Sequence, residues 1–411
     1  MRTFKFYFLF VIALFTLTLS NCASDENAED NTVKPEVPIP EIPKPEIPHT
    51  LDLSYKKVIN DKQIKRLIKT NDNGYIGLFI STDYIVVKFD AGFNIMWEKK
   101  YGGSKNEYAS TIVQDNYGDY MIVGQSESTD GDVTGNYGDY DIWLCKIDKN
   151  GNLLWQKNYG GSKYDRFEAI QTNENGFILI GSSDSNDHDF TTNQGGFDAW
   201  IVKINKDGII ENKTNIGGSL NEYGLEIFPI NNDFIISIGV QLNNTNYTWI
   251  IKLNENGKII WKTQLNDLNP GSIGKTQSGD ILVVNTDAKD FILYRLDSNG
   301  NIKLRKTITF YDQNKKQPFA NSITESKDNG IIVTGPLSGG NDADVILFRT
   351  NSDFTSVISK FVIGNDFDIP ANILPIGNYN YILPITTSSQ DLPLNRDNSI
   401  FSTMFLSLKE D

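Results

Sequence analysis

The sequence predicts an all-β protein, a seven-bladed β-propeller of four-stranded blades, from three observations. Residues 101–104, 159–162 and 216–219 all end in Gly-Gly-Ser, and their starts lie 58 and 57 residues apart. Between them the chain is rich in β-branched and aromatic residues and is interrupted by Asn-Gly and Asp-Gly turns. A strand ending in a basic and then an apolar residue recurs in seven copies, the last of them decayed. Repeats of this length and composition are typical of propeller blades rather than of helical solenoids.

The recurring strand is followed by a turn such as Asn150-Gly151, which favours a hairpin into the next strand. In three copies that next strand carries a tryptophan, at Trp97, Trp155 or Trp261. If Gly-Gly-Ser marks the step between blades, the recurring strand is the third of four and the tryptophan strand is the outermost. The copies of the recurring strand begin at Ile85, Trp143, Trp200, Trp249, Ile292, Ile346 and Met404.

The two ends of the chain predict how the ring closes. The seventh recurring strand runs to Asp411 with no outer strand after it. Residues 53–59 have the pattern of an outer strand but no blade of their own. Because a closed ring leaves no sheet edge unpaired, we predict that this amino-terminal strand completes the last blade. The propeller domain would then comprise residues 50–411.

The first 21 residues have the layout of an export signal. Arg2 and Lys5 precede an apolar run at residues 6–19, which is short for a membrane span. Residues 19–22, Leu-Ser-Asn-Cys, resemble the lipobox of bacterial lipoproteins, with Asn21 in place of the usual small residue. The resemblance implies that Cys22 is the lipidated first residue of the mature protein. The alternative is an ordinary secretory signal without an anchor.

Residues 22–49 are predicted to be a lipidated, acidic and proline-rich stalk. Ala23 after the cysteine resembles an outer-membrane sorting signal, and Ser24-Asp25-Glu26 with the acids just beyond resembles the acidic export tag of Bacteroidetes surface lipoproteins. The resemblance implies an outer-membrane lipoprotein exposed at the cell surface. Proline recurs at every second or third position of residues 34–48, so that neither helix nor sheet can form. An extended polyproline II segment of this length would span about 45 Å.

Composition limits the partners. The formal charge is −14, and removal of residues 1–21, which contain Arg2 and Lys5 and no acid, would make it −16. Such a charge disfavours phosphate backbones, so we expect no nucleic acid partner. Cys145 lies in an apolar strand and is expected to be a buried hydrophobic residue, since Cys22 would carry lipid. We expect a monomer attached to the membrane only by its lipid.

Residues 141–165 resemble the β-propeller repeat of bacterial surface and secreted proteins. The resemblance extends over residues 50–411 and is strongest in residues 84–219. Members of that family mostly lack an assigned activity, so the resemblance implies surface display and binding rather than a reaction. We therefore expect a binding or scaffold module for a protein or a glycan, without enzymatic activity.

The alternative is a carbohydrate-active enzyme of the glycoside hydrolase type, which would use paired carboxylates. The 52 acidic residues leave that open, whereas His49 and His188 are the only histidines and no nucleophile motif is present. The turns at residues 70–75, 172–177 and 326–331 resemble the Asp-box turns of sialidases. We interpret these turns as structural hairpins, because Asp-Asn-Gly sequences are what such hairpins select.

A basic residue recurs near the end of the third strand. These residues could form an anion-binding ring, but a base repeated in every blade usually has a partner inside the blade. We expect that partner to be the acid after Gly-Gly-Ser, as at Glu107, Asp165 or Glu222. The bases are Lys88, Lys146, Lys203, Lys252, Arg295 and Arg349.

Two long loops, at residues 126–140 and 183–197, are the predicted binding face. They join second to third strands, on the side of the propeller that also carries the blade-to-blade connections, and they combine acids with aromatic residues. No cofactor is evident, except that Asp130, Asp132 and Asp139 have a spacing suited to calcium. The alternative is that both loops are solvated turns. The candidate binding residues are Asp130, Asp132, Tyr137, Asp139, Tyr140, Asp184, Asp187, Asp189 and Phe190.

The lipid anchor makes a direct prediction. In cells, Cys22→Ser should abolish acyl labelling and move the protein from the membrane to the soluble fraction, because several buried acyl chains are what make such anchorage lasting. Cell fractionation with labelled fatty acid measures both effects. Full-length variant that stays with the membrane would refute the anchor.

Overall fold

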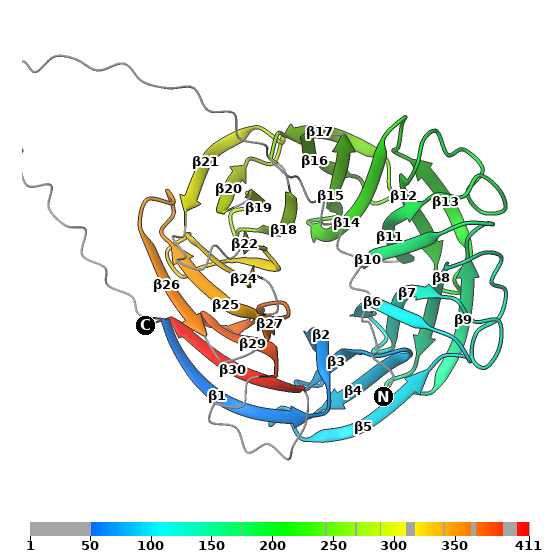
Figure 1. Cartoon of the computed structure of the whole chain (residues 1–411), viewed down its shortest axis with the longest axis horizontal. Coiled ribbons are helices and arrows are strands. Elements are labelled where there is room, and N and C mark those ends of the chain that lie inside the picture. Colours follow the sequence, from blue (N-terminus) through cyan, green and yellow to red (C-terminus); the bar gives the residue numbers. More distant parts are fainter. Residues whose placement is uncertain are drawn as a thin grey trace, which may run out of the picture. The chain divides into compact units, whose positions relative to one another are not determined.

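The computed structural model describes residues 51–410 except 174, 243–244, 268, 288, 310–316, 340–341, 363–366 and 389–400. These residues form seven antiparallel sheets around a common axis, which confirms the predicted seven-bladed β-propeller (Figure 1). Within this described part, no helix is long and apolar enough to cross a membrane. The predicted signal peptide, Cys22 and the stalk lie outside the described residues.

In each blade the chain begins at the axis and proceeds outward strand by strand. Blade 1 holds β2 (Gln63–Lys69), β3 (Tyr75–Ile80), β4 (Tyr84–Phe89) and β5 (Ile95–Tyr101); blade 2 holds β6 (Glu107–Gln114), β7 (Tyr120–Ser126), β8 (Asp141–Ile147) and β9 (Leu153–Tyr159); blade 3 holds β10 (Asp165–Asn173), β11 (Gly176–Ser183), β12 (Asp198–Asn205) and β13 (Ile210–Asn215). Blade 4 holds β14 (Asn221–Ile230), β15 (Asp233–Leu242), β16 (Thr245–Leu253) and β17 (Ile259–Leu265); blade 5 holds β18 (Asn269–Lys275), β19 (Ile281–Asp287), β20 (Asp290–Leu296) and β21 (Ile302–Thr309).

In the last two blades the innermost strand is split into two short pieces. Blade 6 holds β22 (Gln317–Pro318), β23 (Ser322–Glu325), β24 (Ile331–Gly339), β25 (Asp342–Thr350) and β26 (Val357–Val362); blade 7 holds β27 (Asp368–Pro370), β28 (Leu374–Gly377), β29 (Asn380–Thr387), β30 (Ser402–Glu410) and β1 (Leu51–Asn60).

The amino-terminal strand closes the ring, as predicted. β1 pairs antiparallel with β30 along its whole length, from Leu51 opposite Glu410 to Asn60 opposite Ser402. The completed blade is then packed onto blade 1, where Phe405 of β30 stacks on Phe93 with ring centroids 4.6 Å apart. Because β1 covers β30, the carboxyl-terminal strand is not left as an open edge.

The core lies between neighbouring blades. Every residue of β8 and of β11 is buried, as expected for strands that are covered on both faces. Cys145 on β8 is a free, fully buried thiol, which confirms its predicted role as a small core residue.

In blades 1, 2 and 4 the tryptophan of the outermost strand joins the blade to the next one, and in blades 1 and 2 the tyrosine at the end of that strand does so too. Trp97 Nε1 donates to the Lys149 carbonyl at 3.2 Å, and the Tyr101 hydroxyl donates to the Gly151 carbonyl at 2.6 Å. Gly151 has a φ of 79°, and a Cβ there would lie 3.1 Å from the Trp97 ring. The turn therefore needs glycine both for its backbone and for the ring that covers it. Trp155 lies against Gly208, and Trp261 against Gly300, in the same way.

Five of the six basic residues of the third strands pair with an acid of their own blade, but the predicted partner is wrong, and Arg295 instead donates to the Asn329 carbonyl of blade 6. Lys88 contacts Asp72 at 2.9 Å and Lys146 contacts Asp115 at 3.0 Å, and both acids lie in the turn between the first two strands. The base sits near the end of the third strand, which is the end of the blade that carries this turn. Glu107, Asp165 and Glu222 lie at the opposite end of the innermost strand, out of reach. The same arrangement joins Lys252 to Asp233 and Arg349 to Asp328.

Ring closure can be tested by deletion. Removal of Leu51–Asn60 should lower the midpoint of thermal unfolding by more than about 10 °C and promote aggregation, because it exposes the edge of β30. Removal of residues 25–48 is the matched control and should leave the midpoint unchanged. Equal midpoints for the two deletions would contradict closure by β1.

Candidate functional site

The two predicted binding loops are structural equivalents, 57 residues apart in sequence. The loop at residues 126–141 joins β7 to β8 and the loop at residues 183–198 joins β11 to β12. Each folds back over the Gly-Gly-Ser connection that precedes its blade: the Asp132 amide donates to the Gly102 carbonyl at 2.9 Å, and the Asp189 amide donates to the Gly160 carbonyl at 3.1 Å. We call the side of the propeller that carries these loops and connections the loop face.

Carboxylates of the loops accept hydrogen bonds from the backbone of the connections. In blade 2 the Ser104 amide donates to Asp130 Oδ1 at 2.7 Å and the Gly102 amide donates to Asp132 Oδ2 at 3.2 Å. The Gly103 amide donates to Glu107 Oε2 at 2.9 Å. These amides have no partner strand, so the carboxylates satisfy donors that would otherwise be lost on burial. The equivalent acceptors in blade 3 are Asp187, Asp189 and Asp165.

The glycines of the motif are required by this close approach. A Cβ on Gly103 would lie 2.4 Å from the Ser128 Cβ, and one on Gly160 would lie 2.3 Å from Asp141 Oδ1. Neither gap can hold a methyl group. The recurrent Gly-Gly-Ser thus reflects a backbone that lies directly against carboxylates and loop backbone.

The predicted calcium ligands are not gathered into one group. Asp130 and Asp132 bond to backbone amides, whereas Asp139 is exposed on its loop. Over residues 51–410 as described, no group of three or more His, Cys, Asp or Glu side chains is placed to hold a metal ion. Calcium binding stays a prediction without a ligand set in this structure.

Phe190 is not part of the binding face, and its prediction as an exposed aromatic is wrong. Its side chain is fully buried, with its ring centroid 5.0 Å from that of Trp200 and 6.2 Å from that of Phe167. Val133 occupies the equivalent position in the other loop and is equally buried. An apolar residue at this position fastens each loop to the core, because the polar residues around it cannot.

The other predicted aromatic residues do lie on the loop face. Tyr137 is 53% exposed and stacks on His188 of the neighbouring loop, with ring centroids 4.4 Å apart. His188 has a φ of 49°, in the left-handed region. The equivalent residue of the other loop is a glycine, Gly131, with a φ of 66°. A non-glycine residue there carries backbone strain, which the stacking helps to offset.

Five aromatic rings form a continuous chain across blades 2, 3 and 4 on this face. Successive ring centroids are 5.8, 5.4, 5.9 and 5.5 Å apart. Tyr108 is 44% exposed and the other four rings are half-buried. We call this set the aromatic arc; in order it consists of Tyr108, Tyr140, Tyr164, Phe197 and Tyr223.

Polar side chains hold the arc in place. The Tyr164 hydroxyl accepts from Gln125 Nε2 at 2.6 Å, and the Tyr140 hydroxyl donates to Glu127 Oε2 at 3.3 Å. The Arg166 guanidinium lies over the Tyr223 ring, 5.2 Å from its centroid. Burial raises the pKa of the Tyr140 hydroxyl, so this group stays protonated and can donate.

Sequence reasoning found only Tyr140 of the arc. The signal that it missed is positional: Tyr140 and Phe197 each precede the first residue of a third strand, Asp141 or Asp198. Tyr108 and Tyr223 likewise hold equivalent positions, each directly after the acid that follows Gly-Gly-Ser, Glu107 or Glu222. Aligning the repeats for aromatic residues, rather than for strands, would have indicated the arc.

Two buried acids lie under the loops. Burial raises the pKa of Asp141 to about 7, with further contributions from the charges of Asp165, Asp189 and Asp187. Burial also raises the pKa of Asp165 to about 6. Both side chains have no exposed surface, and Oδ1 of each has no hydrogen-bond partner among the described residues. They support the loops and are out of reach of a ligand.

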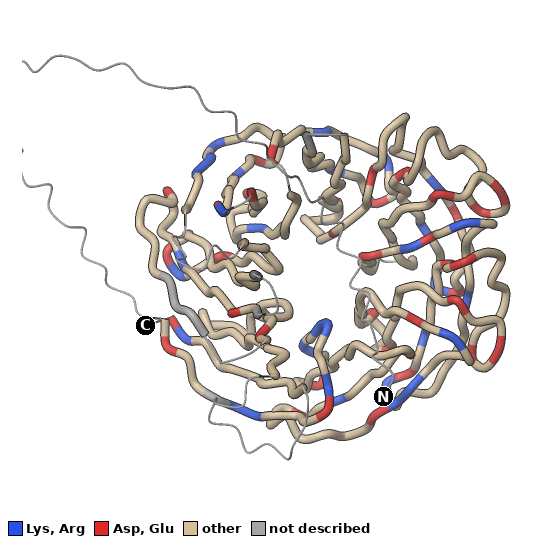
Figure 2. Tube along the Cα trace, viewed as in Figure 1, with Lys and Arg blue, Asp and Glu red and all other residues tan. Residues whose placement is uncertain are grey.

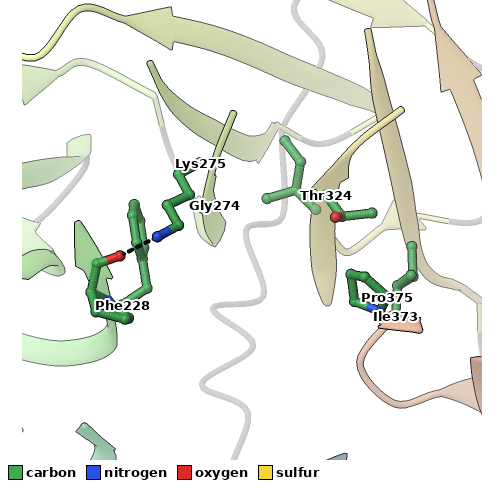
Figure 3. Close-up of a pocket in the computed structure, with 8 residues that line it drawn as sticks. Phe228, Gly274, Lys275, Thr324, Ile373 and Pro375 are labelled. Carbon is green, nitrogen blue, oxygen red and sulfur yellow. Dashed lines mark hydrogen bonds between the residues drawn. The ribbon is translucent and has the colours of Figure 1, made fainter. Parts of the chain in front are cut away.

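A cavity of about 330 Å³ opens at the axis on the opposite side of the ring (Figure 3). It is formed by the innermost strands of blades 4 to 7, and its wall is mainly apolar. Lys275 Nζ donates to the Pro229 carbonyl at 3.0 Å across one side of it. Its lining residues are Phe228, Pro229, Gly274, Lys275, Ile323, Thr324, Ile373 and Pro375, none of them acidic.

Comparisons with known proteins identify the fold. No protein-family model matches the chain, and no curated protein does. An ulvan lyase, a polysaccharide lyase, superposes with a TM-score of 0.57 at 9% identity over 85% of this chain and 94% of its own. The Pan2 WD40 domain of Neurospora crassa gives 0.53 at 7% identity, over 87% and 95%. A Bacteroides caccae protein of unknown function gives 0.41 at 14% identity, over 72% and 94%. At such identities these similarities show a β-propeller fold alone.

The buried acids predict an unusual pH dependence. The native state binds the Asp141 proton more tightly than the unfolded chain, whose pKa is near 3.8, so the free energy of unfolding should fall as the pH rises toward 7. Between pH 5 and 8, the free energy of unfolding should fall by about 2 kcal/mol less in Asp141→Asn than in the wild type, as measured by urea unfolding. Asp90→Asn is the control, since hydrogen bonds from Asn94 lower the pKa of that exposed acid. An unchanged slope in Asp141→Asn would contradict the raised pKa.

Proposed function

We propose that this protein is a surface-anchored lipoprotein that binds a glycan on the aromatic arc. The arc itself is the observation that carries the proposal. Half-buried rings with hydroxyl groups offer flat apolar area together with hydrogen-bonding edges, and their few rotatable bonds keep the entropy cost of binding low. Sugars present the matching combination of apolar ring faces and hydroxyl edges.

The rigidity of the loops that carry the aromatic arc also favours glycan binding there. Tyr140 and Phe197 sit on loops whose carboxylates and amides are bonded to the connections beneath, and Val133 and Phe190 fasten those loops to the core. A binding surface that is already ordered loses little conformational freedom when the ligand arrives.

The two ends of β1 lie on opposite sides of the ring. Asn60 pairs with Ser402, which follows a connection of the same kind as the two binding loops, so that end of β1 lies at the loop face. Leu51, at the other end of the 10-residue strand, lies roughly 30 Å away on the opposite side. The amino-terminal end of β1 therefore lies on the side of the ring opposite the arc, which leaves the arc accessible to a partner.

The alternative, a glycoside hydrolase on the same fold, has one observation in its favour. Glu226 on the innermost strand β14 is half-buried, and loss of solvation raises its pKa. Its carboxylate, however, accepts hydrogen bonds from the Ser272 hydroxyl and the Ile273 amide, and its charged neighbour is Arg66 rather than a second acid. Binding without hydrolysis is the function that these contacts support best.

Single substitutions in the arc test the function. On a glycan array, Tyr140→Ala and Phe197→Ala should each weaken binding of the glycan found with wild type at least tenfold, about 1.4 kcal/mol, because each removes a ring from the surface. Tyr117→Ala is the matched control: that ring is 78% exposed in the turn between β6 and β7, on the opposite side of the ring.

Thermal midpoints near that of the wild type would show that the arc variants are folded. Retention of full affinity by both folded arc variants would overturn the proposal, as would a surface pull-down in which a protein is the only partner captured. Release of reducing sugar from the bound glycan would favour the hydrolase instead.

A further inference from the structure

We infer that the glycan held by the aromatic arc is uncharged, a neutral oligosaccharide without uronic acid, sulfate or phosphate groups. This inference rests on the proposed function and adds the chemical class of the ligand. It comes from the charges around the arc, which are independent of the rings themselves.

The loops that carry the arc are strongly acidic. Between the strands, residues 127–140 contain four acidic residues and residues 184–197 contain three, with no lysine or arginine in either loop. Acidic positions accordingly recur along the loops of blades 2 and 3 (Figure 2). An anionic sugar on the arc would approach carboxylates of like charge at short range, within a chain of formal charge −14.

The basic groups beside the arc are already engaged. Arg166 Nε lies 3.6 Å from Glu168 Oε1 while the guanidinium covers Tyr223, and Lys163 Nζ lies 3.4 Å from Asp184 Oδ1. Lys105, in the equivalent connection of blade 2, lies close enough to Asp130 to help lower the pKa of that acid. To bind an anionic group, Arg166 and Lys163 would first have to give up their contacts with Glu168 and Asp184.

The acceptors next to the rings suit hydroxyl groups. Glu127 Oε2 accepts from the Tyr140 hydroxyl at 3.3 Å and from Asn106 Nδ2 at 3.4 Å, both of them long hydrogen bonds. A carboxylate accepts charge-assisted hydrogen bonds from sugar hydroxyls, which are donors that every neutral glycan offers. Glu127 and Glu168 therefore attract the hydroxyls of a neutral sugar and repel the anionic group of an acidic one.

Matched pairs of oligosaccharides test the inference. Affinities should be measured for neutral glycans and for the same backbones carrying glucuronic acid or sulfate, in low salt and in 0.5 M NaCl. We expect the acidic member of each pair to bind at least tenfold more weakly than the neutral member in low salt. This difference in affinity, called the gap below, should be smaller in high salt because exposed charges are screened. The double variant Glu127→Gln, Glu168→Gln should narrow the gap in low salt, since it removes two negative charges and frees Arg166.

The control is Glu255→Gln, which removes one exposed negative charge in the turn between β16 and β17, on the opposite side of the ring. It should leave the gap unchanged. If acidic glycans bind as tightly as neutral ones and Tyr140→Ala abolishes both, the proposed function stands and the inference about charge is wrong. If no glycan binding depends on Tyr140 or Phe197, the proposed function itself fails.

Discussion

Unpaired backbone amides in the blade-to-blade connections are the constraint on which the loop face depends. The amides of Gly103 and Ser104 lie between two sheets, where neither sheet can supply an acceptor. Carboxylates supply it, and to reach the backbone they need glycine at the contact. The loops that bring Asp130 and Asp132 to the connection also bring Tyr140 beside Tyr108 and Tyr164. The aromatic arc is thus positioned by the same hydrogen bonds that satisfy the backbone amides of the connections.

Sequence reasoning succeeded where a pattern is local and repeated. The blade period, the hairpins and the missing outer strand all follow from residues close together in the chain, and each is confirmed by the sheets. Sequence reasoning failed where the environment of a residue depends on contacts that the local pattern does not contain. Lys88 was assigned to the wrong acid because the two ends of a blade cannot be told apart without the strand directions. Phe190 was taken as exposed because its loop is polar on both sides, although a polar loop still needs an apolar anchor.

The candidate site was predicted only in outline. The two loops are on the expected face, and Tyr137 and Tyr140 are accessible there, but four of the five rings of the arc were not predicted. Tyr164 and Phe197 are separated by a whole strand pair in sequence, and only the fold brings their rings within 5.9 Å.

The seven blades differ in what they contribute to closure of the ring and to the aromatic arc. Closure requires all seven, whereas the arc uses blades 2 to 4, so that blades 5 to 7 could diverge without loss of the surface.

The pairing of β1 with β30 has a mechanical consequence. Ladder hydrogen bonds in an antiparallel pair run perpendicular to the strands. A ligand held at the loop face and a tether attached at Leu51 would pull along the axis of β1, from opposite ends of the ring. Such a force shears the nine residue pairs of β1 and β30 together instead of unzipping them one after another. The strand that closes the ring is therefore also oriented to resist a pull along its own axis.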